Sequence, residues 1–341
     1  MLGKIQIFVA SAIGFTLVAG RVPAATTDFY DGKTIRIVVG ASAGGGVDTY
    51  ARTIARHMGK HIPGKPAIIV ENMAGAGSLI AANHLYKVAK PDGLTVGSFL
   101  GGLILQKLLG RQGIEFDPLK FEYVGIPAKE NYVIGVSKAT GINSVEKWMA
   151  TKTPVKLGGV GSGSGTDDIP KVLTAVVGLP LQLVTGYKGT AEVRLAFNSG
   201  EVSGVCIGWG TFASTWRKEL DSGELNVVLQ AMAKPHPALP KIPLAIDLAK
   251  TDEARKLIQA VAHTNSDILR LYVLPPGTPK ERVRILGKAF IDTLHDKEFL
   301  AAAQKARLEI EPVPGEAVET IVSNLFKLEP ALVARLKEIL Q

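Results

Sequence analysis

Two segments of this chain have the same order of strand, glycine-rich loop and helix. Residues 33–58 read KTIRIVVGASAGGGVDTYARTIARHM, and residues 153–178 read TPVKLGGVGSGSGTDDIPKVLTAVVG. In each, an apolar run of strand length leads through small residues and Asp into helical periodicity. Where such a loop feeds a helix, unpaired backbone N–H groups and the helix dipole favour a bound anion. The chain therefore predicts two anion-binding loops that face each other across a cleft between two lobes.

The rest of the chain also alternates strand-like with helix-like runs, which is typical of α/β proteins with parallel sheets. Its 341 residues, 46% of them hydrophobic, suffice for two ordinary cores. The expected strands are residues 35–39, 67–71, 95–99, 122–126, 133–136, 155–158, 181–184, 205–207, 226–229 and 269–274. The expected helices are residues 49–58, 78–88, 145–150, 169–177, 191–198, 212–220, 279–293 and, in pieces, 317–339.

The division into lobes is predicted from two segments that bracket the middle third. Residues 121–136 and 225–240 each read as a strand that runs into a loop. If both cross between lobes, residues 128–230 form lobe 2, and residues 26–127 with 231–341 form lobe 1. Two crossing strands would then act as the hinge.

The first residues have the pattern of a secretory signal peptide. Lys4 precedes an apolar stretch at residues 5–19, and Val22 and Ala24 suit the small-residue positions of a cleavage site. The stretch is shorter than the roughly 20 apolar residues of a membrane span. We expect residues 1–25 to be removed and, because no Cys lies near their end, no lipid anchor there. The expected location is the periplasm.

Several other functions are disfavoured by the residues. The 39 Lys and Arg are scattered among 31 acids and aromatics are 6%, so the charge of +8 indicates a basic surface and no nucleic-acid partner. The loop at 161–166 lacks a dinucleotide fingerprint, and the GKT at residues 32–34 precedes a strand. The single Cys206 permits neither a disulfide nor a multi-cysteine metal site. His57 and His61 lack the acid of a metal motif. We expect no cofactor and no metal.

One enzymatic alternative remains, a secreted serine hydrolase that uses Ser42. Residues 40–44 fit the G-x-S-x-G nucleophile elbow, and His236, His263 or His295 could serve as the base. An elbow serine follows several strands of its sheet, however, whereas the expected mature chain allows only one strand before Ser42.

Three aspartates begin the helices after the two loops. Asp48 is expected to accept hydrogen bonds from first-turn amides. Of the pair Asp167 and Asp168, one can do the same while the other faces the cleft, where it would attract an amine or hydroxyl group of a ligand. Tyr187, in a turn before the next helix, could supply a wall and a hydroxyl.

These loops resemble those of the Bug-type solute-binding proteins of tripartite tricarboxylate transporters. The likeness spans nearly the whole expected mature chain. It includes the glycine–Asp loop at 40–48, VENMAGAGSLIAANHLYKVAKPDG at 70–93, GYKGTAEVRLAFNSGE at 186–201 and LYVLPPGTPKERVRILGKAF at 271–290. Each motif alone is weak, but together they are quite specific.

The resemblance implies a periplasmic binding protein with two Rossmann-like lobes, of the type II or Venus-flytrap kind. Such a protein, expected as a monomer, captures a small carboxylated solute and delivers it to a permease of one large and one small membrane subunit. Main-chain amides of the two loops would hold the carboxylate. The predicted ligand-binding residues are Ser42, Ala43, Gly44, Gly45, Gly46, Asp48, Ser98, Gly161, Ser162, Gly163, Ser164, Thr166, Asp167, Tyr187 and Trp209.

This chain departs from the family pattern at two places. Many members carry an aromatic residue where this chain has Ala41, and many carry His where it has Asp167 and Asp168. The wall is therefore changed and an acid is added, which disfavours a plain dicarboxylate. Backbone loops recognise the charge and shape of a ligand and leave little side-chain signature in the sequence. The sequence therefore does not distinguish between mono-, di- and tricarboxylates and amino acids as the ligand.

The receptor and hydrolase alternatives are separated by a fluorophosphonate probe. Because a binding loop needs no activated nucleophile, we expect the wild-type protein and the Ser42→Ala variant to show the same background labelling on a gel. Labelling of the wild type that the substitution abolishes would establish the hydrolase.

Overall fold

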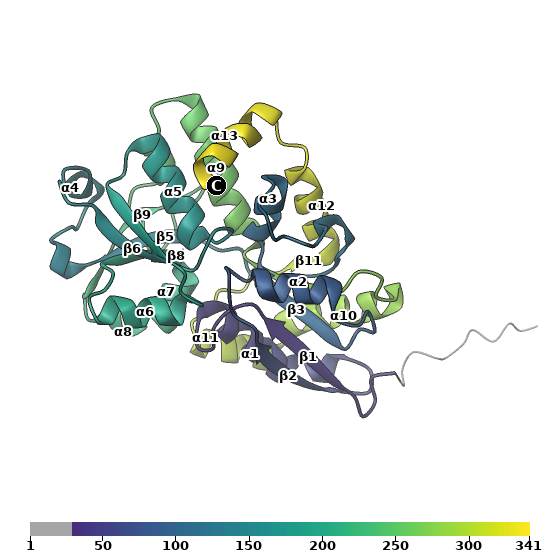
Figure 1. Cartoon of the computed structure of the whole chain (residues 1–341). Helices are drawn as coiled ribbons and strands as arrows, with labels where there is room; N and C mark the ends of the chain where they lie inside the picture. The colour runs from purple at the N-terminus through teal and green to yellow at the C-terminus, as the bar shows by residue number, and fades with distance from the viewer. Residues whose placement is uncertain (1–28) are drawn as a thin grey trace, which may run out of the picture.

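The computed structural model describes residues 29–341, apart from the side chains of His263 and Thr264. The expected signal peptide lies outside the described residues. The chain forms two separate sheets that lie side by side, each covered by helices (Figure 1). This arrangement confirms the predicted α/β class with two lobes.

The first sheet contains the amino-terminal glycine loop. Its six strands are, in spatial order, β11 (Val313–Pro314), β4 (Glu122–Ile126), β10 (Arg270–Leu274), β3 (Thr95–Leu100), β1 (Thr34–Val39) and β2 (Ala67–Asn72). β1 pairs in parallel with β2 and β3, while β10 is antiparallel to β3 and β4. The parallel strands are joined by helical crossovers, as parallel pairing requires.

The second sheet has the same plan on a smaller scale. Its five strands are, in spatial order, β7 (Leu181–Thr185), β6 (Val155–Gly159), β8 (Gly204–Gly208), β5 (Tyr132–Ser137) and β9 (Leu225–Gln230). β6 pairs in parallel with β7 and β8, and β5 is antiparallel to β8 and β9. Cys206 is buried in β8, as expected of a small apolar residue.

Helices cover both faces of each sheet. The first sheet packs against α1 (Gly46–Met58), α10 (Lys280–Leu294) and α11 (Lys297–Lys305) on one face, and against α2 (Leu79–Lys87), α3 (Gly102–Leu108) and α12 (Gly315–Leu325) on the other. Around the second sheet lie α4 (Val145–Met149), α5 (Gly165–Val177), α6 (Thr190–Asn198), α7 (Trp209–Thr215) and α8 (Arg217–Asp221). Short 3-10 helices lie at Gly59–His61, Pro118–Lys120, Lys138–Thr140 and Ala245–Leu248.

Two further helices connect the lobes. α9 (Asp252–Ile268) and α13 (Pro330–Leu340) come from the range expected in lobe 1, yet both pack on α5 beside the second sheet, at the top of Figure 1. Residues of both contribute to the core of the second sheet, Leu257 and Leu336 among them. The chain also crosses between the sheets after β4 and before β10. The division into lobes at residues 127 and 230 stays a prediction. α9 and α13, which come later in the chain, form part of the second core.

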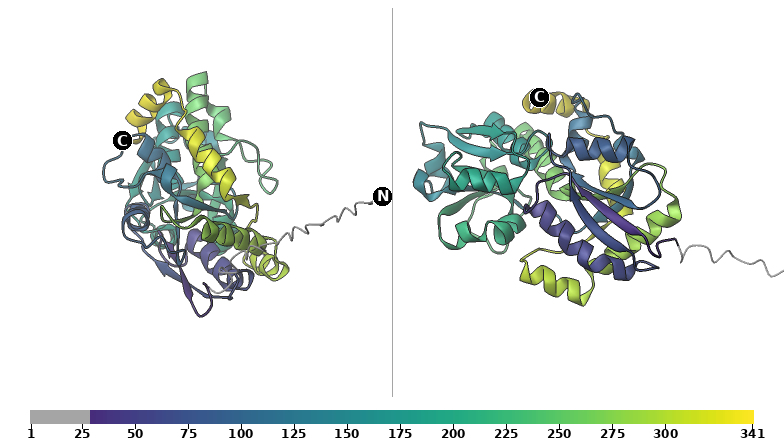
Figure 2. Two further views of the ribbon diagram at one scale, coloured as in Figure 1. Left: turned by 90° about the vertical axis from the view of Figure 1, so that its right-hand side faces the viewer. Right: turned by 60° about the horizontal axis from the view of Figure 1, so that its bottom comes forward.

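The two glycine loops leave the carboxyl ends of β1 and β6 and lead into α1 and α5. In the right-hand view of Figure 2, the purple α1 begins where the two halves of the molecule meet. Residues at the starts of α1 and α5 line the same cavity. Ser42 N donates to Lys188 O at 3.2 Å, so the first loop touches the turn before α6 directly. Within residues 29–341, no helix is long and apolar enough to cross a membrane.

The packing of β3 gives a test of the fold. A Cβ on Gly97 would collide with the fully buried side chain of Leu85, so Gly97→Ala should lower the free energy of unfolding by about 1–3 kcal/mol. At Gly287, within α10, the nearest atom to an added Cβ is 3.8 Å away. Gly287→Ala should therefore raise stability by about 0.5–1 kcal/mol. Urea unfolding measures both, and equal effects of the two substitutions would contradict this packing.

Candidate ligand-binding site

A small cavity lies between the two sheets. Its volume is about 40 Å³, and it is lined by the starts of α1 and α6, the ends of β3 and β8, and the first residue of β10. Of the predicted ligand-binding residues, Gly45, Gly46, Ser164 and Thr166 line it. The other predicted positions lie around it, and their contacts are described below.

The first loop is held in shape by the carboxylate of Asp48. This side chain, 2% exposed, accepts from Gly44 N at 2.8 Å, from Arg52 Nε at 2.9 Å and from Asn72 Nδ2 at 2.8 Å. Burial alone would raise the pKa of Asp48, but the hydrogen bonds from Arg52, Gly44 and Asn72 lower it overall. Asp48 is thus ionised and bound inside its own loop, with Gly44 in the turn at φ +77°.

Gly45 and Gly46 bring the backbone of α1 against the second lobe. Gly46 N lies 3.4 Å from Thr190 Oγ1 at the start of α6. A Cβ on Gly46 would collide with the hydroxyl of Thr211 in α7. Only glycine allows this close approach, so these two positions are required where the lobes meet.

The second loop is occupied by its own carboxylates. Asp167 Oδ2 accepts from Gly161 N at 2.9 Å and from Thr166 Oγ1 at 2.7 Å. Asp168 accepts from Gly163 N at 3.1 Å. The amides of Gly161 and Gly163, which were predicted to hold a ligand carboxylate, therefore have partners within the chain. α5 begins with Ser164 as its N-cap, whose side chain accepts from Thr166 N at 3.2 Å.

Asp168 also joins the two lobes. Its carboxylate is fully buried and accepts from Gln106 Nε2 of α3 at 3.0 Å. Burial raises the pKa of Asp168 to about 7, against the opposing effect of the Gln106 and Gly163 hydrogen bonds. Gln106 Oε1 is buried without a hydrogen-bond partner among the described residues. A protonated Asp168 could donate to that oxygen, which makes the proton easy to accommodate.

The remaining predicted residues make contacts of their own. Ser162 accepts through its carbonyl from Arg111 Nη1 and through Oγ from Lys171 Nζ at 3.3 Å. Tyr187 donates to Glu201 Oε1 at 2.5 Å. Ser98 is buried within β3, Trp209 stacks near His236 with ring centroids 5.7 Å apart, and Ala43 is a solvent-exposed loop residue.

Ser42 lacks the surroundings of an activated nucleophile. Its Oγ is buried and makes no hydrogen bond to any described residue. Of the histidines nominated as its base, His236 pairs with Glu309 Oε1 at 2.9 Å and His295 Nδ1 lies 2.9 Å from Ile291 O. The side chain of His263 lies outside the described residues. The geometry does not favour the hydrolase.

Arg270 is a candidate functional side chain that the sequence analysis missed. It begins β10, is 1% exposed, and lines the cavity. Its Nη2 forms an ion pair with Glu130 and lies 3.2 Å from Thr211 Oγ1, while Nε and Nη1 are buried without hydrogen-bond partners among the described residues. The ring of Tyr50 lies 4.2 Å from the guanidinium carbon. An arginine within the apolar run ILRLYVL was a signal available in the sequence, since unpaired buried charge is rare.

Glu130 orients this arginine. It lies in the crossing between β4 and β5, is 1% exposed, and its Oε1 lies 3.2 Å from Asn131 N and 3.3 Å from Gly210 N. Burial lowers the pKa of Arg270, but the charge of Glu130 outweighs that effect and raises it. The guanidinium is therefore charged, which suits it to a carboxylate or another anion.

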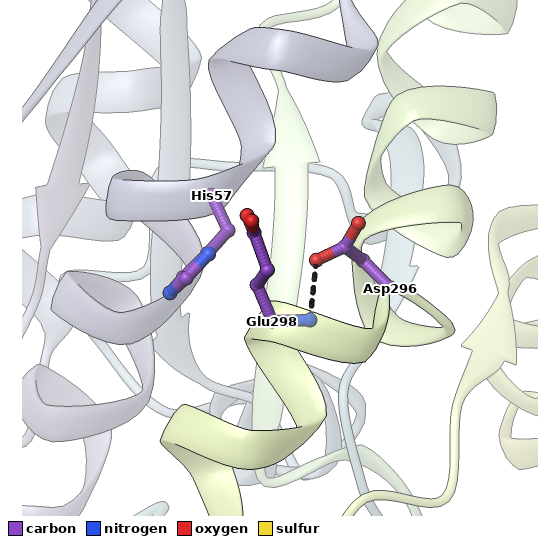
Figure 3. A group of neighbouring side chains, drawn as sticks. All are labelled: His57, Asp296 and Glu298. Atoms are coloured by element: carbon purple, nitrogen blue, oxygen red, sulfur yellow. Dashed lines mark hydrogen bonds between the residues drawn. The ribbon is translucent and has the colours of Figure 1, made fainter.

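One cluster among the described residues has the composition of a metal site. His57, Asp296 and Glu298 meet where α1 faces the start of α11 (Figure 3). Lys60 Nζ already bonds Asp296 at 2.9 Å and Glu298 at 2.6 Å, and Asp296 caps α11 by accepting from Glu298 N and Phe299 N. These bonds account for the cluster as a surface ion-pair network and helix cap.

Known structures share this architecture. The periplasmic binding protein BugD matches with a TM-score of 0.75 at 22% identity, covering 91% of this chain and 98% of that one. MatC from Rhodopseudomonas palustris, solved with bound malate, matches with a TM-score of 0.69 at 20% identity, covering 91% and 99%. The two-lobed fold is that of periplasmic binding proteins.

The sequence comparisons identify the family. A protein of Cupriavidus necator described as a UPF0065 protein in the gbd 5′ region is 24% identical over 333 residues, which is 96% of this chain and 95% of the relative. The model of the tripartite tricarboxylate transporter family receptor matches residues 50–322. The chain therefore belongs to this family of solute-binding receptors, and the resemblance drawn from its motifs is confirmed.

The buried carboxylate of Asp168 gives a pH-dependent prediction. Between about pH 4 and pH 7 the native state keeps a proton on Asp168 that the unfolded chain releases, so wild-type stability falls as the pH rises through this window. Asp168→Asn cannot lose a proton. Relative to the wild type it should gain up to about 4 kcal/mol of unfolding free energy between pH 4 and pH 8, measured by urea unfolding.

The control is Asp48→Asn. The pKa of Asp48 is lowered, so its stabilisation is complete above about pH 4 and is lost only as the pH falls further. This variant should be destabilised equally at pH 5 and pH 8. If the difference in unfolding free energy between Asp168→Asn and the wild type stays constant from pH 5 to pH 8, Asp168 is ionised throughout that range.

Proposed function

We propose that this protein is an extracytoplasmic receptor that captures a small carboxylated solute between its two lobes. It delivers the solute to a transporter permease with one large and one small membrane subunit. Export through the amino-terminal segment and action as a periplasmic monomer are parts of the same proposal. Family membership supports the receptor role, and the bound malate of MatC is an example of a carboxylate in this fold.

The observation that carries the proposal is the cavity between the sheets with a buried cation in its wall. Arg270 supplies unpaired guanidinium nitrogens, and the start of α1 brings its dipole to the same place. A hydrogen bond to a charged group contributes about 1.5–3 kcal/mol. Three or four such bonds reach the ~8 kcal/mol of a micromolar complex once ordering costs are subtracted.

Capture requires the lobes to move. A cavity of about 40 Å³ has room for only about three waters, each of which needs about 10–15 Å³ of such space, and a four-carbon acid has more non-hydrogen atoms than that. The lobes meet through short polar contacts, such as Ser42 N to Lys188 O and Gln106 to Asp168. Such contacts are individually weak. We therefore infer hinge opening at the crossings, with ligand contacts to both lobes favouring closure.

No reaction is needed to explain the site. The groups in the cavity wall are glycine backbone, serine and threonine hydroxyls, one tyrosine, apolar side chains, one lysine and one arginine, and none is an activated nucleophile. Binding without turnover accounts for all of them. The hydrolase at Ser42 is not retained as a second candidate.

Blocking the lobe contact tests this function. A thermal-shift screen of mono-, di- and tricarboxylates and amino acids, followed by calorimetry, should identify a ligand for the wild type. Gly46→Val inserts a side chain against Thr211, so the lobes cannot close, and the Kd should rise at least 100-fold with the melting temperature little changed. The control Gly287→Ala, in α10 and away from the cavity, where an added Cβ meets only Val124 O at an ordinary contact distance of 3.8 Å, should bind normally. Tight binding by Gly46→Val would place the ligand elsewhere.

A further inference from the structure

We propose that Arg270 is the anchor for a single carboxylate, and that the solute is a small acid whose remaining body is apolar. This inference rests on the proposed function and adds to it the ligand-anchoring side chain and the class of acid. The glycine-rich backbone loops, which the resemblance expects to hold the carboxylate, do not account for this anchor, because in this chain the second loop binds the carboxylates of Asp167 and Asp168.

The first step is that Arg270 has hydrogen-bond donors without a protein partner. Its guanidinium is 1% exposed, and only Nη2 is engaged, by Glu130 and Thr211. Nε and Nη1 are buried with no hydrogen-bond partner among the described residues. Leaving charged donors unpaired in a dry site is costly, and a ligand carboxylate relieves that cost. This makes the unpaired donors a strong source of binding energy.

The second step is that Arg270 is held in place without being fully neutralised. Glu130 uses one oxygen for Nη2 while its other oxygen faces the amides of Asn131 and Gly210. Tyr50 covers one face of the guanidinium, with its ring centroid 4.2 Å away. The arginine is therefore preorganised, and little side-chain entropy is lost when an anion binds.

The third step concerns what surrounds the anchor. Three hydroxyls in the cavity wall belong to Ser78, Ser164 and Thr166: Ser78 donates to Gly40 O at 2.6 Å, Ser164 and Thr166 bond each other at 2.7 Å, and Thr166 also donates to Asp167. Two more, those of Thr190 and Thr211, accept from Gly46 N and from Arg270. The rest of the wall is largely apolar, with Leu100, Tyr132, Val160, Ile207 and Leu269. Such a wall favours an apolar body.

The fourth step excludes a second buried carboxylate. On the second lobe, a second anionic group would approach the carboxylate of Asp167, which accepts from the hydroxyl of the cavity-lining Thr166. Nearby like charges repel. The one other cationic residue in the lining is Lys188, which is exposed at the rim. One charge is therefore bound deep in the cleft, and a second is not.

Matched pairs of acids and amides test this inference. Benzoate and butanoate are compared with benzamide and butanamide, and with succinate and malate, by calorimetry on the full-length mature protein. We expect the wild type to bind at least one monocarboxylate at least 100-fold more tightly than its amide, and more tightly than succinate or malate.

The variants then separate anchoring from folding. Arg270→Met alone would leave Glu130 buried and unpaired, so the test uses the double variant Glu130→Gln with Arg270→Met, in which neither charge remains. It should stay folded and lose the preference for acid over amide. Glu130→Gln alone should keep that preference or increase it. Lys87→Met, which removes an exposed cation of α2 outside the cavity, is the control and should leave the preference unchanged.

Each outcome has a defined meaning. If no acid in the panel binds the wild type, both the proposed function and this inference fail. If acids bind but the double variant keeps the acid-over-amide ratio, Arg270 is a purely structural residue and the receptor function stands. If succinate or malate binds as tightly as the monocarboxylates, the single-charge inference is wrong.

Discussion

The two glycine-rich loops are held by carboxylates of their own helices, and the rest of the site depends on this interaction. Asp48 binds Gly44 N, Asp167 binds Gly161 N, and Asp168 binds Gly163 N. A loop rich in glycine has little intrinsic preference for one conformation, so these hydrogen bonds fix its path. They also occupy amides that would otherwise be free for a ligand. Recognition of an anion must then come in large part from another group, and Arg270 is the buried cation in the cavity wall.

The ion pair between Arg270 and Glu130 lies where the chain passes between the sheets. Arg270 begins β10 at the return to the first sheet, and Glu130 lies between β4 and β5. A buried ion pair contributes little net stability on average, because desolvation offsets attraction. What matters here is the position of the ion pair between the two sheets. A ligand bound at Arg270 contacts the segments that must bend when the lobes open, and so binding and hinge position are directly coupled.

Sequence patterns predicted the local elements well and the partners of charged groups poorly. Strands β1 and β6, the loops after them and the helices that follow are encoded by apolar runs, glycine and helical spacing, and they lie where expected. The helix α9 was missed, although Thr251 caps it, because its polar face obscures a short apolar stripe. The sequence analysis also did not predict that Asp167 and Asp168 both bind amides of their own loop. Whether an acid faces the cleft or its own loop depends on side-chain rotation, which spacing does not determine. Arg270 required the tertiary fold, because Glu130 is 140 residues away along the chain.

The contacts between the lobes explain why a ligand can control closure. The polar ones include Gly46 N with the hydroxyl of Thr190, Ser42 N with the carbonyl of Lys188, and the amide–carboxylate pair of Gln106 and Asp168. Each such bond exchanges with water on opening and contributes only about 0.5–1.5 kcal/mol net. The open and closed arrangements therefore differ by an amount that one charged hydrogen-bonded ligand can reverse. In the proposed receptor, the small and polar residues at the start of α1 and α6 would thus serve release, as Arg270 would serve capture.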